Sequence, residues 1–129
     1  MKCADQADSI DVFSLGGVFY YLLSDGHRPW YYISGYQNGV KKWLNKEKPR
    51  LPNLGDYEKY GDKVVEFMSL RANHTAFVAL KEVMYKCFEY EPKDRPSSFE
   101  VVQMLEAKWK EMSVDSAKKK NGRLMKRLH

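Results

Sequence analysis

The side chains that most often carry protein chemistry are few and widely separated in this sequence. The histidines are His27, His74 and His129, and the cysteines are Cys3 and Cys87. Their separations match neither the ligand spacing of a zinc site nor the pattern of a disulfide framework. We therefore expect no metal centre and no disulfide. Free thiols fit an intracellular protein, in the cytoplasm or alternatively in the nucleus.

Two charged residues, Asp11 and Arg95, stand where a polar side chain could have a specific role. Asp11 opens a long apolar stretch, so its carboxylate could accept hydrogen bonds from backbone N–H groups at a helix amino end. The planar guanidinium of Arg95 could bind a carboxylate through two parallel hydrogen bonds. Taken alone, these residues predict a helix cap at Asp11 and a surface ion pair at Arg95.

The element expected to hold Asp11 is a helix from Ile10 to Ser24, which Gly26 ends. Its apolar residues recur every three or four positions, the spacing of a helix face. Since its other faces are also rich in apolar residues, the helix is predicted to lie at the centre of a domain. The main face carries Val12, Leu15, Phe19, Leu22 and Leu23.

Arg95 is expected between the last two helices. One helix is predicted from about Thr75 to Tyr90, and the next begins at Ser97, where Ser97 and Glu100 have the spacing of a capping box. The predicted buried residues of the first helix are Phe77, Leu80, Met84, Cys87 and Phe88. Those of the second are Phe99, Val102, Leu105, Trp109 and Met112.

Weaker signals fill the middle of the chain. A helix is predicted over residues 37–47, with Val40, Trp43 and Leu44 as its apolar stripe. Two prolines make residues 49–52 extended, and a short helix is predicted over residues 62–70. No segment alternates with a period of two, so the predicted fold class is all-α, with about four to five helices and no sheet.

The positive charge of the chain is concentrated in its last residues. Residues 113–129 contain six Lys or Arg residues and a single acid, Asp115, whereas residues 1–112 have no net charge. The folded part therefore gives no indication of nucleic-acid binding. We predict one domain over residues 1–112 and a basic, largely disordered tail over residues 113–129. Membrane binding is not expected beyond weak contacts of this tail.

Two segments together resemble a known family. Residues 11–16, Asp-Val-Phe-Ser-Leu-Gly, are similar to the Asp-x-Trp/Phe-Ser-x-Gly motif that opens the central helix of the protein kinase large lobe. Residues 92–97, Pro-Lys-Asp-Arg-Pro-Ser, are similar to the Pro-x-x-Arg-Pro-Ser motif that opens its last helix. Between them, Gly26, Pro29 and Trp30 resemble the Gly-x-x-Pro-Phe stretch. Residues 49–52 resemble the Pro-x-Leu-Pro exit from the next helix.

The resemblance covers roughly residues 5–112 and implies a role for several residues. It implies that the fold is the helical C-terminal half of the kinase large lobe. The counterpart of Asp11 holds the catalytic loop through its backbone, and the counterpart of Arg95 pairs with the Glu of an Ala-Pro-Glu motif. The helix that carries Val40, Trp43 and Leu44 is a docking surface for substrates and regulators.

The sequence also departs from the kinase pattern. A kinase needs a Gly-rich loop, a Lys on a strand, a catalytic-loop Asp and Asn, and an Asp-Phe-Gly for magnesium. None of these motifs occurs in these 129 residues, and neither does the Ala-Pro-Glu partner of Arg95. The intact family uses ATP and Mg²⁺, but no cofactor and no catalytic residue is expected in this chain, and we predict that the chain alone is inactive.

Two functions therefore remain open from the sequence. The first is a partial protein kinase domain, whose intact relatives transfer the ATP γ-phosphate to protein Ser/Thr or Tyr hydroxyls and whose missing segments are its expected neighbours. The second is a non-enzymatic helical module, derived from a kinase lobe, that binds protein partners. A third, weaker alternative is an unrelated helical protein that binds anionic surfaces through its tail. An apolar central helix without its neighbours also predicts self-association.

Overall fold

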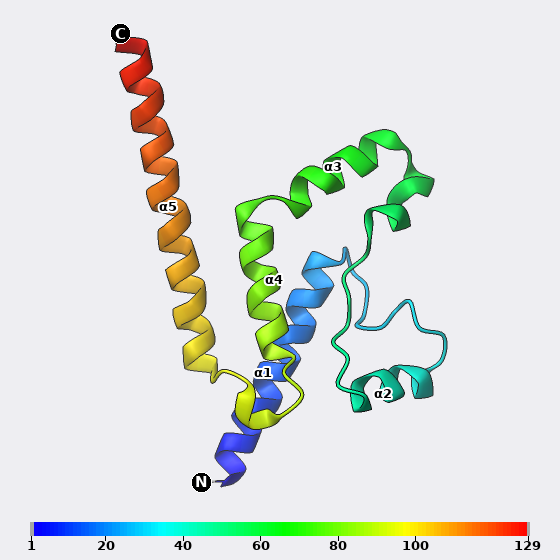
Figure 1. Cartoon of the computed structure of the whole chain (residues 1–129). Helices are drawn as coiled ribbons and strands as arrows, with labels where there is room; N and C mark the ends of the chain where they lie inside the picture. Colours follow the sequence, from blue (N-terminus) through cyan, green and yellow to red (C-terminus); the bar gives the residue numbers. More distant parts are fainter. Residues whose placement is uncertain (1, 129) are drawn as a thin grey trace.

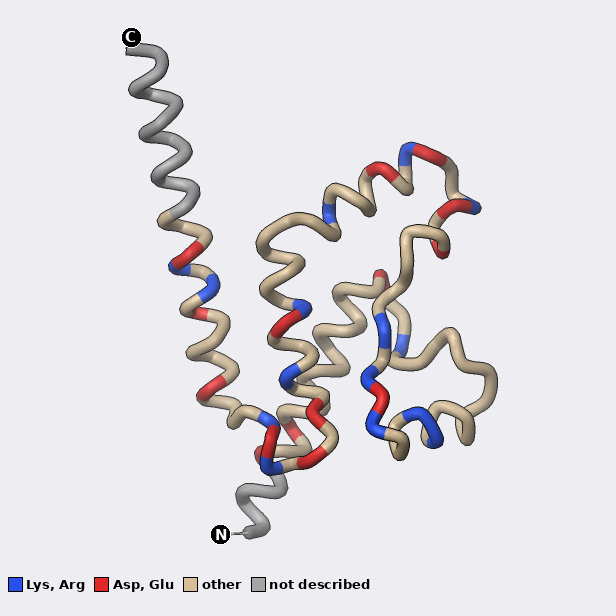
Figure 2. Tube along the Cα trace, in the orientation of Figure 1, with Lys and Arg blue, Asp and Glu red and all other residues tan. Residues whose placement is uncertain are grey.

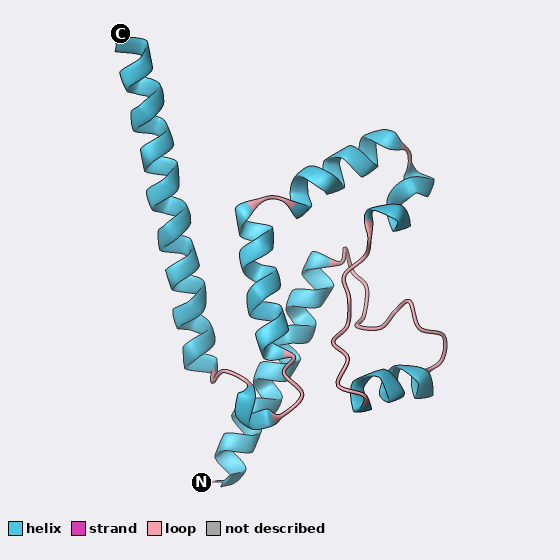
Figure 3. Ribbon diagram, in the orientation of Figure 1, coloured by secondary structure: helices cyan, strands magenta, loops and turns pink. Residues whose placement is uncertain are grey.

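The computed structural model describes the backbone over residues 2–128 and the side chains over residues 8–114. Seven helical elements follow one another, and the described residues contain no strand, which confirms the all-α prediction (Figure 3). The α-helices are α1 (Lys2–Leu23), α2 (Tyr36–Leu44), α3 (Asp62–Ala72), α4 (Thr75–Cys87) and α5 (Ser98–Leu128). Two short 3₁₀ helices, η1 (Leu54–Tyr60) and η2 (Pro92–Asp94), lie between them.

The core of the molecule forms where α1 and α4 cross, with α5 on one side and α2 on the other (Figure 1). The hydrophobic residues of this core come from α1, α4 and the start of α5. Each is almost fully excluded from solvent: Val12, Phe19, Tyr20, Leu23, Val83, Met84, Cys87, Phe88 and Val101. The predicted face of α4 is confirmed for Met84, Cys87 and Phe88, whereas its other two residues, Phe77 and Leu80, are partly buried against the core.

The central helix α1 is longer than predicted. It begins at Lys2, not at Ile10. The side chains of Asp8 and Ser9 hydrogen-bond with Ser98 and Arg95. Because neither side chain caps α1, the helix continues past them towards the N-terminus. Its end agrees with the prediction. Gly26 has a φ of 91° and donates its N–H to the Tyr21 carbonyl at 2.8 Å, a left-handed conformation that glycine adopts without strain.

The segment that follows α2 lies against α1. Pro49 is fully buried, and the neighbouring Arg50 carbonyl accepts a hydrogen bond from the Tyr20 hydroxyl. The Arg50 N–H donates to the Tyr32 hydroxyl at 2.9 Å. Residues 47–53 contain no helix, as the two prolines predict. Burial raises the pKa of the Tyr20 phenol, which therefore remains a neutral hydrogen-bond donor.

The buried face of α5 differs from the prediction. Val101 is its fully buried residue, while Phe99 and Trp109 are each 69% exposed and Val102 is 51% exposed. The predicted stripe does exist, but α4 covers it only in part. Val102, Leu105 and Trp109 therefore line an open, apolar groove between α4 and α5.

The end of the chain also differs from the prediction of a disordered tail, because the backbone of α5 is helical to Leu128. Residues 117–120 and 123–128 are mostly Ala, Lys, Arg, Leu and Met, which favour a helix without needing an apolar stripe. The basic side chains of residues 115–129 lie outside the described residues. The division into units 1–112 and 113–129 stays a prediction.

Candidate functional site

The two segments that carry the family resemblance contact each other at Arg95. Its Nε donates to the Glu89 carbonyl at 2.8 Å and its Nη2 to the Tyr90 carbonyl at 3.2 Å. Its Nη1 reaches across to α1, where it lies 3.2 Å from the hydroxyl and 3.4 Å from the carbonyl oxygen of Ser9. The guanidinium also lies over the Phe13 ring, 4.8 Å from its centroid. Arg95 thus ties the loop before α5 to α1.

The predicted surface ion pair of Arg95 is wrong. Its acceptors are carbonyl and hydroxyl oxygens, and no carboxylate of a described residue contacts it. Because partial burial removes water from the charged group, the pKa of Arg95 falls below its ordinary value. A guanidinium has five N–H donors, so one N–H of Nη2 has no acceptor among the residues that the structure describes. The carboxylate that the resemblance implies for Arg95 stays a prediction.

The predicted helix cap at Asp11 is also wrong. Since α1 begins at Lys2, Asp11 lies well inside the helix, where the backbone N–H groups already have partners. Its side chain is exposed and makes no hydrogen bond with a described residue. The catalytic loop that the resemblance pairs with Asp11 stays a prediction.

A cap does exist near Asp11, but it belongs to another helix. Asp8 accepts hydrogen bonds from the Ser98 hydroxyl at 2.6 Å and from the Ser98 N–H at 3.3 Å, at the start of α5. The predicted capping box is confirmed as well: the Glu100 N–H donates to Ser97 Oγ at 3.1 Å, and the Ser97 N–H donates to Glu100 Oε1 at 3.4 Å. Sequence reasoning missed Asp8 because its partner is 90 residues away.

The three residues of the predicted docking surface do not all face the same way. Trp43 points into the molecule, where its ring lies 4.9 Å from that of Phe13 and 5.9 Å from that of Trp30. Val40 and Leu44 face outward and are 37% and 60% exposed. Tyr36, one turn before Val40, is 88% exposed and continues their stripe. The candidate docking surface of α2 is therefore Tyr36, Val40 and Leu44, and its use by a partner stays a prediction.

The histidine and cysteine side chains that the structure describes make contacts that stabilise the fold. His27 Nδ1 lies 2.6 Å from the Ser24 carbonyl oxygen, and the His74 side chain accepts the Ala76 N–H at the start of α4. Burial raises the pKa of the Cys87 thiol to about 11, so this side chain packs in the core as a neutral thiol. Cys3 and His129 lie outside the described side chains.

The described residues contain neither a candidate metal site nor a candidate membrane-spanning helix. Over the described side chains, no group of three or more His, Cys, Asp or Glu residues is arranged to hold a metal ion. None of the described helices combines the length and apolar character that crossing a membrane requires. Acidic and basic residues are mixed around the junction of α1, η2 and α5, and basic residues predominate in α2 (Figure 2).

Comparison with protein-family models, with curated proteins and with solved structures gives no match for this chain.

Proposed function

We propose that the chain is the late-helix part of a protein kinase large lobe. It would take part in transfer of the ATP γ-phosphate to protein Ser/Thr or Tyr hydroxyls only together with the segments that bind nucleotide and carry the catalytic residues. The supporting observation is that the first segment belongs to α1, that residues 92–97 and 49–52 contact this helix directly, and that Trp30 reaches it through Trp43.

The contacts involve two regions of α1. Near its middle, Arg95 of residues 92–97 bonds to Ser9 and lies over Phe13. The ring of Phe13 also contacts Trp43, which in turn packs on Trp30. Towards its end, Tyr20 donates to the carbonyl of Arg50 within residues 49–52.

The presence of glycine at the end of the first motif, Gly16, is explained by packing. A Cβ on Gly16 would lie 2.9 Å from Cys87 Cβ and 3.1 Å from Phe88 Cε1. The close crossing of α1 and α4 therefore requires glycine at this position. Gly16 is thus a packing residue of the crossing between these two helices.

No phosphoryl transfer is proposed for these 129 residues alone. Stabilising the transferred phosphoryl group needs metal ligands, a phosphate cradle and a residue that orients the nucleophile. The sequence contains no motif for any of them. The same argument predicts that the chain does not bind ATP with Mg²⁺.

A non-enzymatic interaction module is the second candidate function. It is favoured by the exposed stripe on α2, where Tyr36, Val40 and Leu44 are spaced four residues apart. An apolar stripe of this spacing can seat a partner helix or an extended peptide. In this case the chain would bind its partners without a nucleotide.

Calorimetry with the purified chain tests the first part of the proposal. Titration with ATP and Mg²⁺, against a control titration with Mg²⁺ alone, is expected to give no heat of binding. Saturable micromolar binding would contradict the proposal, because it requires a phosphate site. The coding sequence upstream of Met1 separates the two functions. An in-frame Asp-Phe-Gly and Ala-Pro-Glu favour the kinase, whereas their absence there favours the interaction module.

A further inference from the structure

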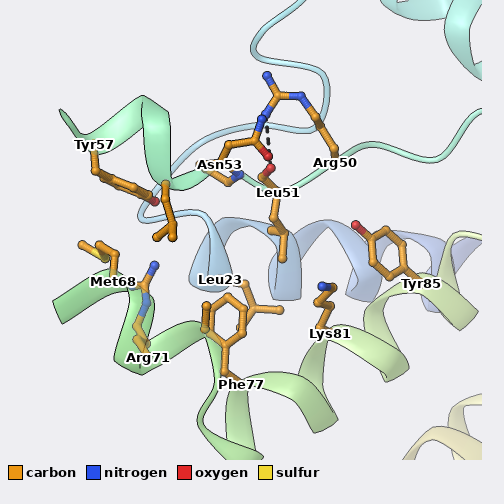
Figure 4. Close-up of a pocket in the computed structure, with 13 residues that line it drawn as sticks. Leu23, Arg50, Leu51, Asn53, Tyr57, Met68, Arg71, Phe77, Lys81 and Tyr85 are labelled. Atoms are coloured by element: carbon orange, nitrogen blue, oxygen red, sulfur yellow. Dashed lines mark hydrogen bonds between the residues drawn. The ribbon is translucent and has the colours of Figure 1, made fainter. Parts of the chain in front are cut away.

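A cavity of about 300 Å³ lies between α3, α4 and the segment that follows α2 (Figure 4). One wall comes from a single stripe of α4, on which Phe77, Lys81 and Tyr85 are spaced four residues apart. The opposite wall is the backbone segment 50–54, and η1 and α3 close one end. Its volume is at the small end of the range for small-molecule pockets.

The charges around this pocket are unequal. Among the described residues, its lining contains three cations, Arg50, Arg71 and Lys81, and no acid. Arg71 is neutralised by Asp25, with oxygens 2.6 and 3.0 Å from its Nη atoms. Arg50 is neutralised in part by Asp56 at 3.4 Å. Lys81 has no ion pair with any described residue, so the pocket has one uncompensated positive charge.

The hydrogen-bond donors of the pocket also favour a ligand that supplies hydrogen-bond acceptors. The ammonium of Lys81, which lines the pocket, has three N–H donors and makes no hydrogen bond with a described residue. Figure 4 shows the Arg71 and Lys81 side chains rising from the same side of the pocket, with Phe77 between them. An anionic group is therefore preferred over a cationic or donor-rich one.

The remaining lining is largely apolar, with Leu23 from α1, Leu51 from the opposite wall and Phe77 from α4. We infer that the pocket binds a small organic monocarboxylate, whose carboxylate pairs with Lys81 and whose apolar body packs against Leu23, Leu51 and Phe77. One uncompensated cation suits a single negative charge, whereas a phosphate dianion would remain partly unpaired. This inference does not depend on the proposed kinase relationship.

A titration of the full chain with 4-phenylbutyrate tests the inference, with binding followed through backbone and Asn53 side-chain amide signals in NMR spectra. We expect saturable binding whose shifts concentrate at the pocket. The neutral 4-phenylbutanamide and inorganic phosphate are each expected to bind more weakly. Equal binding of the amide would show that the charge is not used, and tighter binding of phosphate would show a different ligand class. Either result, or no saturable binding of 4-phenylbutyrate, would overturn the inference.

Variants at Lys81 locate the interaction. Lys81→Met keeps the length of the side chain but removes its charge, and it should weaken binding of 4-phenylbutyrate about fivefold. Lys81→Arg keeps the charge and should bind nearly as the natural chain does. Lys86→Met is the matched control, since Lys86 is also an exposed lysine of α4 but does not line the pocket. Equal weakening by the Lys81→Met and Lys86→Met variants would refute the pairing with Lys81.

Discussion

Gly16 of α1 and Cys87 of α4 face each other so closely that a Cβ on Gly16 would lie 2.9 Å from Cys87 Cβ. Both residues are buried, and Phe88 closes the same contact. Real Cβ atoms do not approach this closely, so any side chain at position 16 would force the two helices apart. The crossing of α1 and α4 holds most of the core. Its geometry therefore depends on a single glycine.

Gly16→Ala is expected to destabilise the chain even though alanine favours a helix. Overpacking of a core costs about 1–3 kcal/mol, whereas the gain in helix propensity is about 1 kcal/mol. Gly17→Ala is the matched control, because a Cβ at position 17 would meet nothing within 4 Å, and it should stabilise the chain by about 0.5–1 kcal/mol. Urea denaturation measures both. Equal effects of the two substitutions would contradict the close contact.

Arg95→Lys is expected to lower the free energy of unfolding by about 2 kcal/mol. A lysine keeps the charge, but its ammonium cannot reach the Glu89, Tyr90 and Ser9 oxygens at once. Lys93→Ala, at an exposed position of η2, should change stability by less than about 0.5 kcal/mol. Chemical denaturation of the three chains provides the comparison. If Arg95→Lys is as stable as the natural chain, Arg95 does not fasten α1 to the loop before α5.

Trp43 and Leu44 are neighbours in sequence but should respond differently to substitution. Trp43→Ala removes ring contacts with Phe13, Trp30 and Tyr90, and it should cost about 2 kcal/mol because Trp43 is half-buried. Leu44→Ala should change stability by less than about 0.5 kcal/mol. Thermal unfolding followed by circular dichroism measures both. A large loss of stability in Leu44→Ala would show that Leu44 is not the free surface residue that docking requires.

The charge of Asp25 makes the stability of the fold depend on pH in the acid range. The hydrogen bonds from Arg71 are the largest cause that lowers the pKa of Asp25, and the Tyr57 hydroxyl donates to it at 2.9 Å. Its carboxylate therefore stabilises the folded chain above the unfolded pKa of about 3.9, and this contribution is lost as the pH falls through the lower folded-state pKa. The side chain is 37% exposed, so screening limits the effect to about 1 kcal/mol.

Asp25→Asn is the appropriate comparison for this effect. Asparagine has the same shape and accepts the left-handed backbone, in which Asp25 has a φ of 61°. The difference in unfolding free energy between the two chains should be constant from neutral pH to about 5 and should shrink below it. A difference that stays constant through the acid range would mean that the Asp25 charge contributes nothing.

The helices could be predicted from local signals in the sequence. Their bounds and buried faces could not be predicted where they depend on contacts between distant residues. Gly26 and the Ser97–Glu100 box act within a few residues, and both end or begin a helix where expected. Asp8 and Ser9 bond to residues 83 or more positions away, so no local pattern reveals why α1 begins early. The apolar pattern of α5 was real, but the pattern alone could not tell that Trp109 is 69% exposed.

The same reasoning applies to the candidate site. Arg95 was singled out correctly as a residue with a specific role, but its partners are carbonyl groups, which every residue has and which no sequence pattern marks. The pocket beside Lys81 combines residues of α1, α3, α4 and the segment after α2. Only the folded chain brings them together, so periodicity along one helix could not have predicted it.

The outer face of α1 should cause the chain to associate with itself. Ile10, Val18 and Leu22 form a stripe on this helix and are 63%, 53% and 62% exposed, and an uncovered apolar stripe of this kind promotes association. Leu22→Lys should shift the chain towards the monomer in sedimentation velocity, because association would then bury a charge. Leu70→Lys, at a leucine of α3 that is 68% exposed, is the control and should leave association unchanged. A natural chain that stays monomeric at its highest soluble concentration, with a sharp unfolding transition at high temperature, would contradict this prediction.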